Sequence, residues 1–122
     1  MVDPHLTKNG KLAYVEIPAL DARASAAFYE NVFGFHVSPG SADRVSFEDG
    51  PRDLIGAFTT QRRASSGTGV MPWLYVTSVT QTLELIGQHG GEVGMLPNPE
   101  GDTLLATFRD PAGNLIGVWQ AL

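Results

Sequence analysis

The 122-residue sequence contains no cysteine. This excludes disulfides, a thiolate nucleophile and cysteine-bound zinc or iron–sulfur centres, and it is typical of a protein of the reducing cytosol. The sequence also has no apolar run near the ~18 residues of a membrane span, and its first residues lack the apolar core of a secretory signal. We therefore expect a cytoplasmic protein.

Basic residues are scarce. Eight lysines and arginines stand against 13 aspartates and glutamates, so the formal net charge is −5. Nucleic acids and anionic lipid surfaces are bound mainly through lysine and arginine, which this balance opposes. The basic doublet Arg62-Arg63 lies in a Ser/Gly-rich stretch and is typical of a solvated connector. Neither nucleic acid nor a membrane is expected as a partner.

What the sequence does contain is one order of elements, strand, helix and three strands, repeated in its two halves. Asp21 is expected to cap the first helix and Gly34 to end it, while Ser78 caps the second. Apolar alternation and turn residues predict strands at 11–18, 35–38, 44–48, 54–60, 73–77, 92–96, 103–109 and 114–120. The halves share little sequence, so the repeat rests on element order. We expect one domain over 1–122, with modules at about 11–60 and 71–120.

Apolar spacing also predicts which helical faces are buried. In the first helix, Ala24, Ala27, Phe28 and Asn31 follow the spacing of one helical face. In the second helix the buried face is expected to contain Val79, Leu83 and Ile86.

Several motifs lie at the ends of these elements: VEIPALD at 15–21, AAFY at 26–29, FGF at 33–35 and DPAGNLIGVW at 110–119. In their order and spacing they resemble the vicinal oxygen chelate superfamily, which includes glyoxalase I, extradiol dioxygenases, fosfomycin-resistance enzymes and bleomycin-binding proteins. The resemblance implies an α+β fold in which two βαβββ modules form a half-open eight-stranded barrel. It also implies a functional site on the concave face, although such a fold alone does not define the chemistry.

Members of this superfamily carry four metal ligands, one on each of four strands. The first, usually histidine, stands seven residues before the aspartate cap, and the last, usually glutamate, stands seven residues after the aspartate of the final turn. In this sequence the four positions fall on Tyr14, on one of residues 55–57, on Trp73 or Leu74, and on Gly117. None of these is a metal ligand, and the three histidines are expected at the surface or near helix ends. We therefore expect no metal and no other cofactor.

The same resemblance, combined with strand alternation, selects the residues that face the cavity. The candidate ligand-binding residues are Tyr14, Glu16, Trp73, Tyr75, Leu115, Gly117 and Trp119. Gly117 and Tyr14 are expected to face open space, so that larger side chains there would be tolerated. Glu16 has two interpretations: it pairs with an arginine or meets water, or it receives a cationic ligand or acts as a base with a raised pKa. The tryptophans suit either packing or ligand stacking.

Three functions remain open at this point. The favoured one is a metal-free protein that binds a small molecule in an apolar, aromatic cavity, similar to the bleomycin-binding members. The second is a lyase or isomerase that uses Glu16 and Tyr14 or a displaced metal site, and the third is a protein that only dimerises. A homodimer is expected in any case, because exposed strand edges favour association. Whether the modules pair within or between chains is left open.

Overall fold

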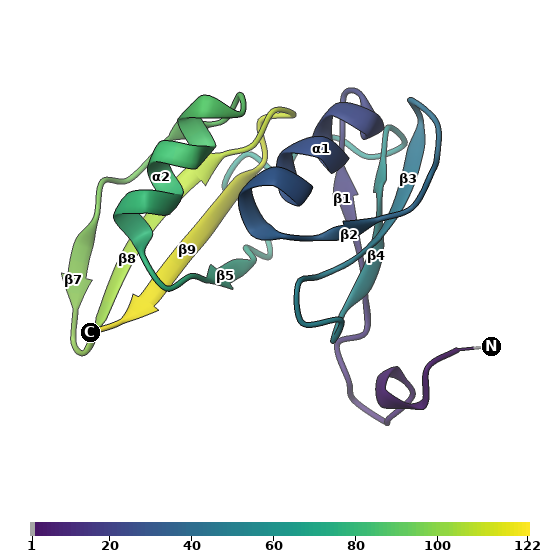
Figure 1. Ribbon diagram of the computed structural model, residues 1–122, viewed down its shortest axis with the longest axis horizontal. Helices are drawn as coiled ribbons and strands as arrows, with labels where there is room; N and C mark the ends of the chain where they lie inside the picture. Colours follow the sequence, from purple (N-terminus) through teal and green to yellow (C-terminus); the bar gives the residue numbers. More distant parts are fainter. Residues whose placement is uncertain (1) are drawn as a thin grey trace. The chain divides into compact units, whose positions relative to one another are not determined.

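Each half of the chain folds as a unit of its own, with one helix against one face of a sheet (Figure 1). The structure is a computed structural model that describes residues 2–122. The first unit ends at Arg63 and the second comprises Ala64–Leu122. No helix in the described part of the chain has the length and apolar character that crossing a membrane requires.

The first unit contains a four-stranded sheet in the order β1-β4-β3-β2, in which β1 runs parallel to β4 and the other pairs are antiparallel. A short 3₁₀ turn, η1 (Pro4–Leu6), precedes the sheet. The elements are β1 (Tyr14–Pro18), α1 (Ala22–Phe33), β2 (His36–Val37), β3 (Arg44–Glu48) and β4 (Ile55–Thr59).

The second unit repeats this order with one additional strand. Its sheet has the order β5-β9-β8-β6, with β5 parallel to β9, and β7 also pairs with β8. The elements are β5 (Trp73–Tyr75), α2 (Val79–Gln88), β6 (Glu92–Val93), β7 (Asn98–Glu100), β8 (Thr103–Arg109) and β9 (Leu115–Ala121). The α+β class and the two strand–helix–strand modules are thus confirmed. Strand β7 was not predicted, because its central proline is a turn signal that an edge strand tolerates.

Helix α1 begins and ends where the sequence predicts. The Asp21 carboxylate accepts a hydrogen bond from the N–H of Arg23 at 3.1 Å, and Gly34 ends the helix with φ 70°. The predicted face was wrong except at Phe28, which is buried: Ala24, Ala27 and Asn31 are exposed. The buried residues of the helix are Ala22, Ser25, Ala26, Phe28 and Tyr29. The true stripe includes a serine and a tyrosine, so apolar spacing alone could not identify it.

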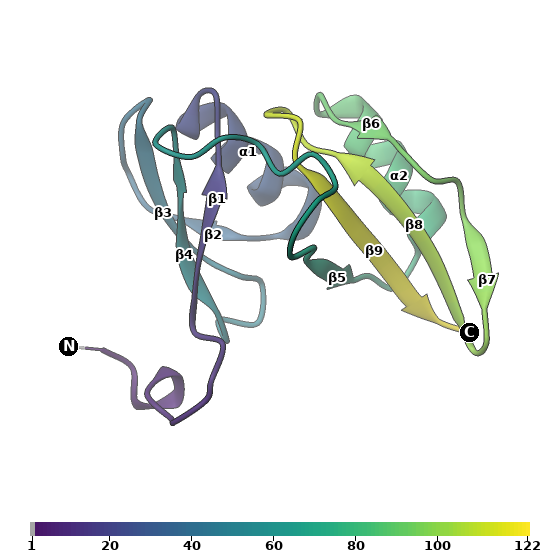
Figure 2. The same ribbon diagram turned by 180° about the vertical axis from the view of Figure 1, so that it is seen from behind.

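Aromatic rings fill the space between α1 and its sheet. The rings of Phe47 and Phe58 lie 4.8 Å apart, and that of Tyr29 lies 5.2 Å from Phe58. All three residues are buried. Because side chains alternate along a strand, the residues next to Phe47 and Phe58 point to the opposite face of the sheet. Figure 2 shows this opposite face of the sheet toward the viewer, with α1 behind β1, β3 and β4.

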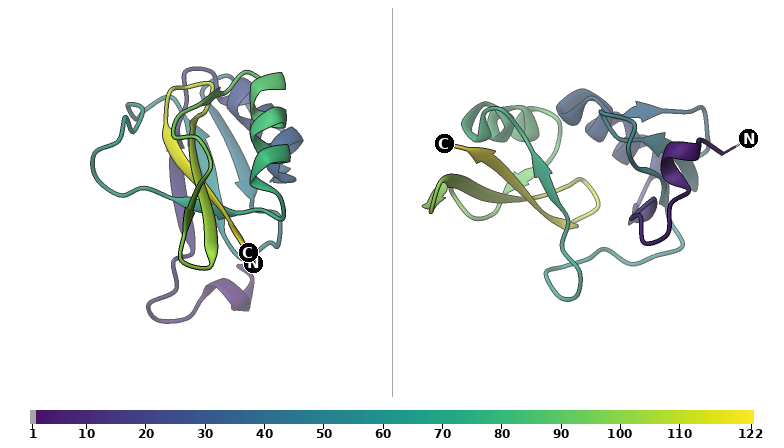
Figure 3. Two further views of the ribbon diagram at one scale, coloured as in Figure 1. Left: turned by 90° about the vertical axis from the view of Figure 1, so that its left-hand side faces the viewer. Right: turned by 90° about the horizontal axis from the view of Figure 1, so that it is seen from below.

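The core of the second unit is mostly aliphatic, with one fully buried aromatic residue, Phe108. The predicted buried face of α2 is confirmed, since Val79, Leu83 and Ile86 are buried. The helix lies along one face of the sheet (Figure 3). Gln120 also lies on this side, because its side-chain oxygen accepts a hydrogen bond from the N–H of Val79 at 2.8 Å. The alternate residues of β9, beginning with Leu115 and ending with Ala121, therefore lie on the face away from α2.

The turn between β8 and β9 is held by a buried carboxylate. Asp110 accepts hydrogen bonds from the N–H groups of Ala112 and Asn114, both at 3.0 Å, and from the Asn114 side chain at 2.8 Å. The Asn114 side chain in turn accepts from the N–H of Ser65 at 2.8 Å. The Ser/Gly-rich segment 61–69, interpreted from the sequence as a solvated connector, is therefore attached to the start of β9 at this point.

Candidate functional site

Five of the predicted site residues lie together on the sheet of the second unit. Strand pairing places Trp73 beside Gly117 and Tyr75 beside Trp119. These residues alternate with the ones that pack against α2, so they lie on the face of the sheet that points away from α2. We call the surface formed by Trp73, Tyr75, Leu115 and Trp119 the aromatic face.

Trp73 covers Gly117. A Cβ atom built on Gly117 would lie 2.2 Å from two atoms of the Trp73 indole, a distance that no real contact allows. Gly117 is accordingly buried, whereas 42% of Trp73 is exposed. The expectation that residue 117 faces open space was therefore wrong: an aromatic ring occupies the position that a side chain would fill, and glycine is what lets the ring lie there.

Tyr75 and Trp119 extend the aromatic face along β5 and β9. Their rings meet edge to face, with centroids 4.7 Å apart and an interplanar angle of 82°. Tyr75 is 53% exposed and Trp119 is half-buried, so the tyrosine ring is the part of this pair most available to a second molecule. Both tryptophans of the chain belong to this face. Such a surface can stack against a flat apolar ligand.

Leu115 lies at the other end of the face, where the connector is attached. Its N–H donates a hydrogen bond to the carbonyl oxygen of Ser65 at 2.7 Å. A Cβ atom on Gly67 would lie 3.3 Å from the Leu115 side chain. The connector thus packs against one end of the aromatic face.

The two remaining predicted residues, Tyr14 and Glu16, lie in the first unit within a charged cluster. The Arg62 Nε donates to the Glu16 carboxylate at 2.7 Å, and Arg44 Nη1 lies 3.7 Å from its second oxygen. Arg44 also donates a hydrogen bond to the Tyr14 hydroxyl. We call Tyr14, Glu16, Arg44 and Arg62 the arginine–glutamate cluster. Its two arginines had not been predicted as site residues, and Arg62 had been interpreted as part of a solvated connector.

These contacts decide how Glu16 behaves. The hydrogen bond from Arg62 has the largest effect and lowers the pKa of Glu16 below its ordinary value of 4.5. Partial burial raises this pKa, but the positive charges of Arg62 and Arg44 lower it further. The alternative in which Glu16 has a raised pKa is contradicted. The interpretation in which Glu16 pairs with an arginine holds for this structure.

This pairing predicts how Glu16 responds to pH. Because its pKa is lowered in the folded state, its pairing stabilises the fold at pH values above the ordinary glutamate pKa and is lost as pH falls through the lowered value. An NMR titration of the Glu16 carboxyl carbon should give a midpoint below 4.5. Arg62→Gln should move the midpoint upward, whereas Arg63→Gln should leave it in place. A midpoint at or above the ordinary value would show that the pair does not persist in solution.

The family's metal does not fit the residues at its expected positions. Tyr14 pairs with Ile55 across β1 and β4, and Trp73 pairs with Gly117 across β5 and β9, so the four positions form two neighbouring pairs. None of these side chains is a histidine or a carboxylate, and the Trp73 indole fills the space that a side chain at position 117 would need. Within residues 2–122 there is no group of three or more histidine, cysteine or acidic side chains that could hold a metal ion. The absence of a metal stays a prediction.

The histidines have other contacts. His5 lies 2.7 Å from the Asp53 carboxylate, and His36 contacts the carbonyl oxygen of Gly50 at 3.2 Å. His89 follows α2 as its C-terminal cap. His5 lies in the turn η1 and is exposed, as expected of a surface histidine.

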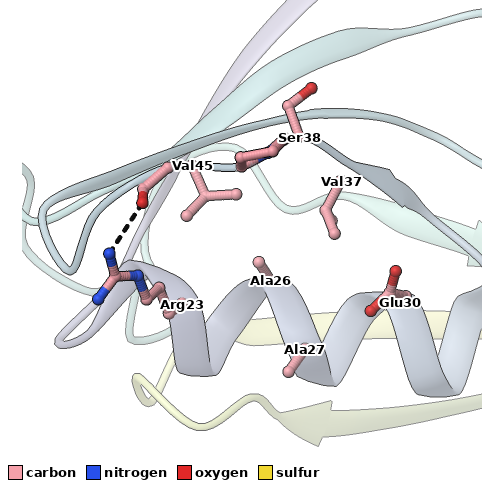
Figure 4. Close-up of a pocket in the computed structure, with 9 residues that line it drawn as sticks. Arg23, Ala26, Ala27, Glu30, Val37, Ser38 and Val45 are labelled. Atoms are coloured by element: carbon pink, nitrogen blue, oxygen red, sulfur yellow. Dashed lines mark hydrogen bonds between the residues drawn. The ribbon is translucent and has the colours of Figure 1, made fainter.

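A groove of about 360 Å³ lies in the first unit between α1 and the strands β2 and β3 (Figure 4). Ala26, Val37 and Val45 line its centre, and Arg23 and Glu30 project from α1 at its two ends (Figure 4). Arg23 already donates a hydrogen bond to the Gly40 carbonyl oxygen at 3.0 Å. The groove contains none of the predicted site residues and gathers no reactive groups, so we place no function in it.

Comparison with known proteins agrees with this fold. Residues 11–118 match the Glyoxalase/Bleomycin resistance protein/Dioxygenase superfamily. The chain belongs to this superfamily. The match covers nearly all of both modules, so the resemblance seen in the motifs is confirmed. No curated protein matches the sequence.

Solved structures of the superfamily share the fold at low sequence identity. A glyoxalase/bleomycin resistance protein/dioxygenase family enzyme from Burkholderia phytofirmans PsJN is 22% identical, with a TM-score of 0.76 over 93% of this chain and 100% of that one. A hypothetical protein from S. aureus is 19% identical, with a TM-score of 0.73 over 93% and 95%. A lactoylglutathione lyase from Agrobacterium tumefaciens is 19% identical, with a TM-score of 0.65 over 93% and 96%. Structural similarity at sequence identities this low establishes the fold, whereas the activity has to be inferred from the residues of the site.

Proposed function

We propose that this superfamily member binds a flat, apolar small molecule on its aromatic face without using a metal. The observation that carries the proposal is the indole of Trp73 lying on Gly117. At the position where relatives are expected to hold a metal with glutamate, this chain presents an exposed aromatic surface. Tyr75 and Trp119 continue it. A ligand that stacks on this surface gains apolar burial and ring–ring contact.

A lyase or isomerase activity through Glu16 has less support. A general base works best when its pKa lies near the working pH, and the pKa of Glu16 is lowered instead. Its carboxylate is also held by Arg62 and Arg44, so it is not poised to accept a proton from a substrate. We therefore propose binding rather than catalysis. A cytoplasmic location belongs to the same proposal and is supported by the cysteine-free composition.

Titration with 2-naphthol, which is flat and uncharged at neutral pH, tests the proposal. The chain has two tryptophans, so its indole N–H groups give two NMR signals, and both report on the aromatic face. We expect 2-naphthol to shift both signals with saturable binding and to do so equally with or without EDTA. Cyclohexanol, which is not flat, should bind far more weakly. Binding that leaves the indole signals in place, or that disappears with EDTA, would contradict the proposal.

We also propose that the protein is a homodimer. Strand β1 has one sheet partner, β4, among the described residues, and its flanking residues Leu12 and Leu20 are 73% and 79% exposed. Exposed strand edges and apolar side chains favour association with a second copy. Light scattering at micromolar concentration should give twice the chain mass of 13.1 kDa. A mass of one chain over that range would refute the dimer.

A further inference from the structure

The arginine–glutamate cluster gathers positive charge on a protein whose net charge is −5. Its members come from three places in the first unit: Glu16 and Tyr14 from β1, Arg44 from β3, and Arg62 from the segment after β4. Strand β4 separates β1 from β3. The ion pair between Arg44 and Glu16 therefore spans β4, and the small side chain of Ala57, which pairs with Glu16, leaves room for it.

The charges in this cluster do not cancel. Two guanidinium groups face one carboxylate, which leaves one positive charge in excess. Another ion pair on the same unit, Arg52 with Glu48 at 3.0 Å, is balanced within itself. A cationic ligand at Glu16, one of the open possibilities in the sequence, would have to displace an arginine that already holds the carboxylate.

The arginines also keep hydrogen-bond donors for another group. Arg62 uses Nε for Glu16, and within residues 2–122 no hydrogen bond engages its two terminal nitrogens. Arg44 uses one terminal nitrogen for the Tyr14 hydroxyl, and its other one lies 3.7 Å from Glu16. About half of each arginine side chain is exposed, 48% for Arg44 and 59% for Arg62. Planar guanidinium donors in this state suit an oxyanion with two oxygens.

We propose that Arg44 and Arg62 form a binding site for the carboxylate of a small organic molecule, with Glu16 holding both guanidinium groups at the surface of the sheet. A carboxylate carries one negative charge and so neutralises the excess, whereas a phosphate dianion would leave the cluster negative. This proposal goes beyond stacking on the aromatic face and stands on other residues. Failure of either proposal leaves the other intact.

Benzoate, benzamide and phenyl phosphate test this site. The three share a ring, and only the attached group differs. In NMR titrations that follow the arginine Nε–H signals, we expect benzoate to shift those of Arg44 and Arg62 with saturable binding that weakens as salt is added. Benzamide should leave them unchanged. Equal shifts from benzamide, tighter binding of phenyl phosphate, or no binding of benzoate up to tens of millimolar would each overturn the carboxylate assignment.

Matched variants separate this site from general charge effects. Arg62→Gln should weaken benzoate binding by about tenfold, the loss of one charge-assisted hydrogen-bonding group. Arg63→Gln removes the same charge one residue away and should change the affinity less than twofold. Equal losses of benzoate affinity in Arg62→Gln and Arg63→Gln would overturn the proposal. So would binding of the cation benzamidine that is abolished in Glu16→Gln. Circular dichroism melts confirm that each variant is folded.

Discussion

Gly56→Ala should destabilise the protein by ~3 kcal/mol or more, the upper range for overpacking a core. Gly56 is the second residue of β4, which lies between β1 and β3. A Cβ atom there would lie 2.0 Å from the carbonyl oxygen of Val15 and 2.6 Å from the ring of Phe47. Neither can move aside, because Val15 belongs to a paired strand and Phe47 is buried. Chemical denaturation followed by circular dichroism measures the loss.

Gly87→Ala provides the matched control. Gly87 lies within α2, and a Cβ atom there meets nothing within 4 Å. Alanine is favoured over glycine inside a helix by roughly 1 kcal/mol, so this variant should be slightly more stable than the native protein. If Gly56→Ala were as stable as Gly87→Ala, the close approach of Val15 and Phe47 to residue 56 would be wrong.

Gly117→Ala should act in a different way, changing binding more than stability. The new methyl group would lie 2.2 Å from the Trp73 indole, but this obstacle is a half-exposed side chain and can rotate away. We expect a loss of about 1 kcal/mol in stability, since overpacking costs little where a neighbour can move. With Trp73 displaced, the affinity for 2-naphthol should fall about tenfold, which corresponds to about 1.4 kcal/mol of lost stacking. Chemical denaturation measures the loss of stability, and calorimetric titration measures the loss of affinity.

A double-mutant cycle checks that the effect runs through the indole. In a Trp73→Ala background, Gly117→Ala should no longer lower stability, because the ring it collides with is gone. Additive losses in the double variant would mean that residue 117 is restricted by something other than Trp73. The Trp73 ring would then not be what excludes a side chain at that position.

The sequence predicted most of the fold because local signals agreed with the final structure. The first helix begins after Asp21 and ends at Gly34, as expected. The strands 44–48 and 103–109 have the predicted limits. Strand β7 escaped prediction because Pro99 lies at its centre. The α1 face escaped because its buried stripe includes polar atoms. Both failures come from residues whose local preference conflicts with their tertiary position.

The candidate site was predictable only in part. Strand alternation correctly grouped Trp73, Gly117 and Trp119 on one face, since alternation depends on local geometry. That the Trp73 ring lies on Gly117 depends on a side-chain rotamer, which spacing does not encode. Arg44 and Arg62 were missed because they reach Glu16 across β4 and from a connector, with no fixed sequence interval. Glycine at 117 was the available signal, since it leaves space that a neighbouring ring can occupy.

Calorimetric titration of 2-naphthol into the native protein, Trp73→Ala and Trp73→Phe, each with EDTA and with added Zn²⁺, tests the central claim most directly. The account predicts that the native affinity is the same in EDTA and Zn²⁺. Trp73→Ala should bind about tenfold more weakly, whereas Trp73→Phe, which keeps a ring over Gly117, should bind nearly as well as the native protein. Binding that requires Zn²⁺, or an affinity unchanged in Trp73→Ala, would contradict a metal-free site built on the aromatic face.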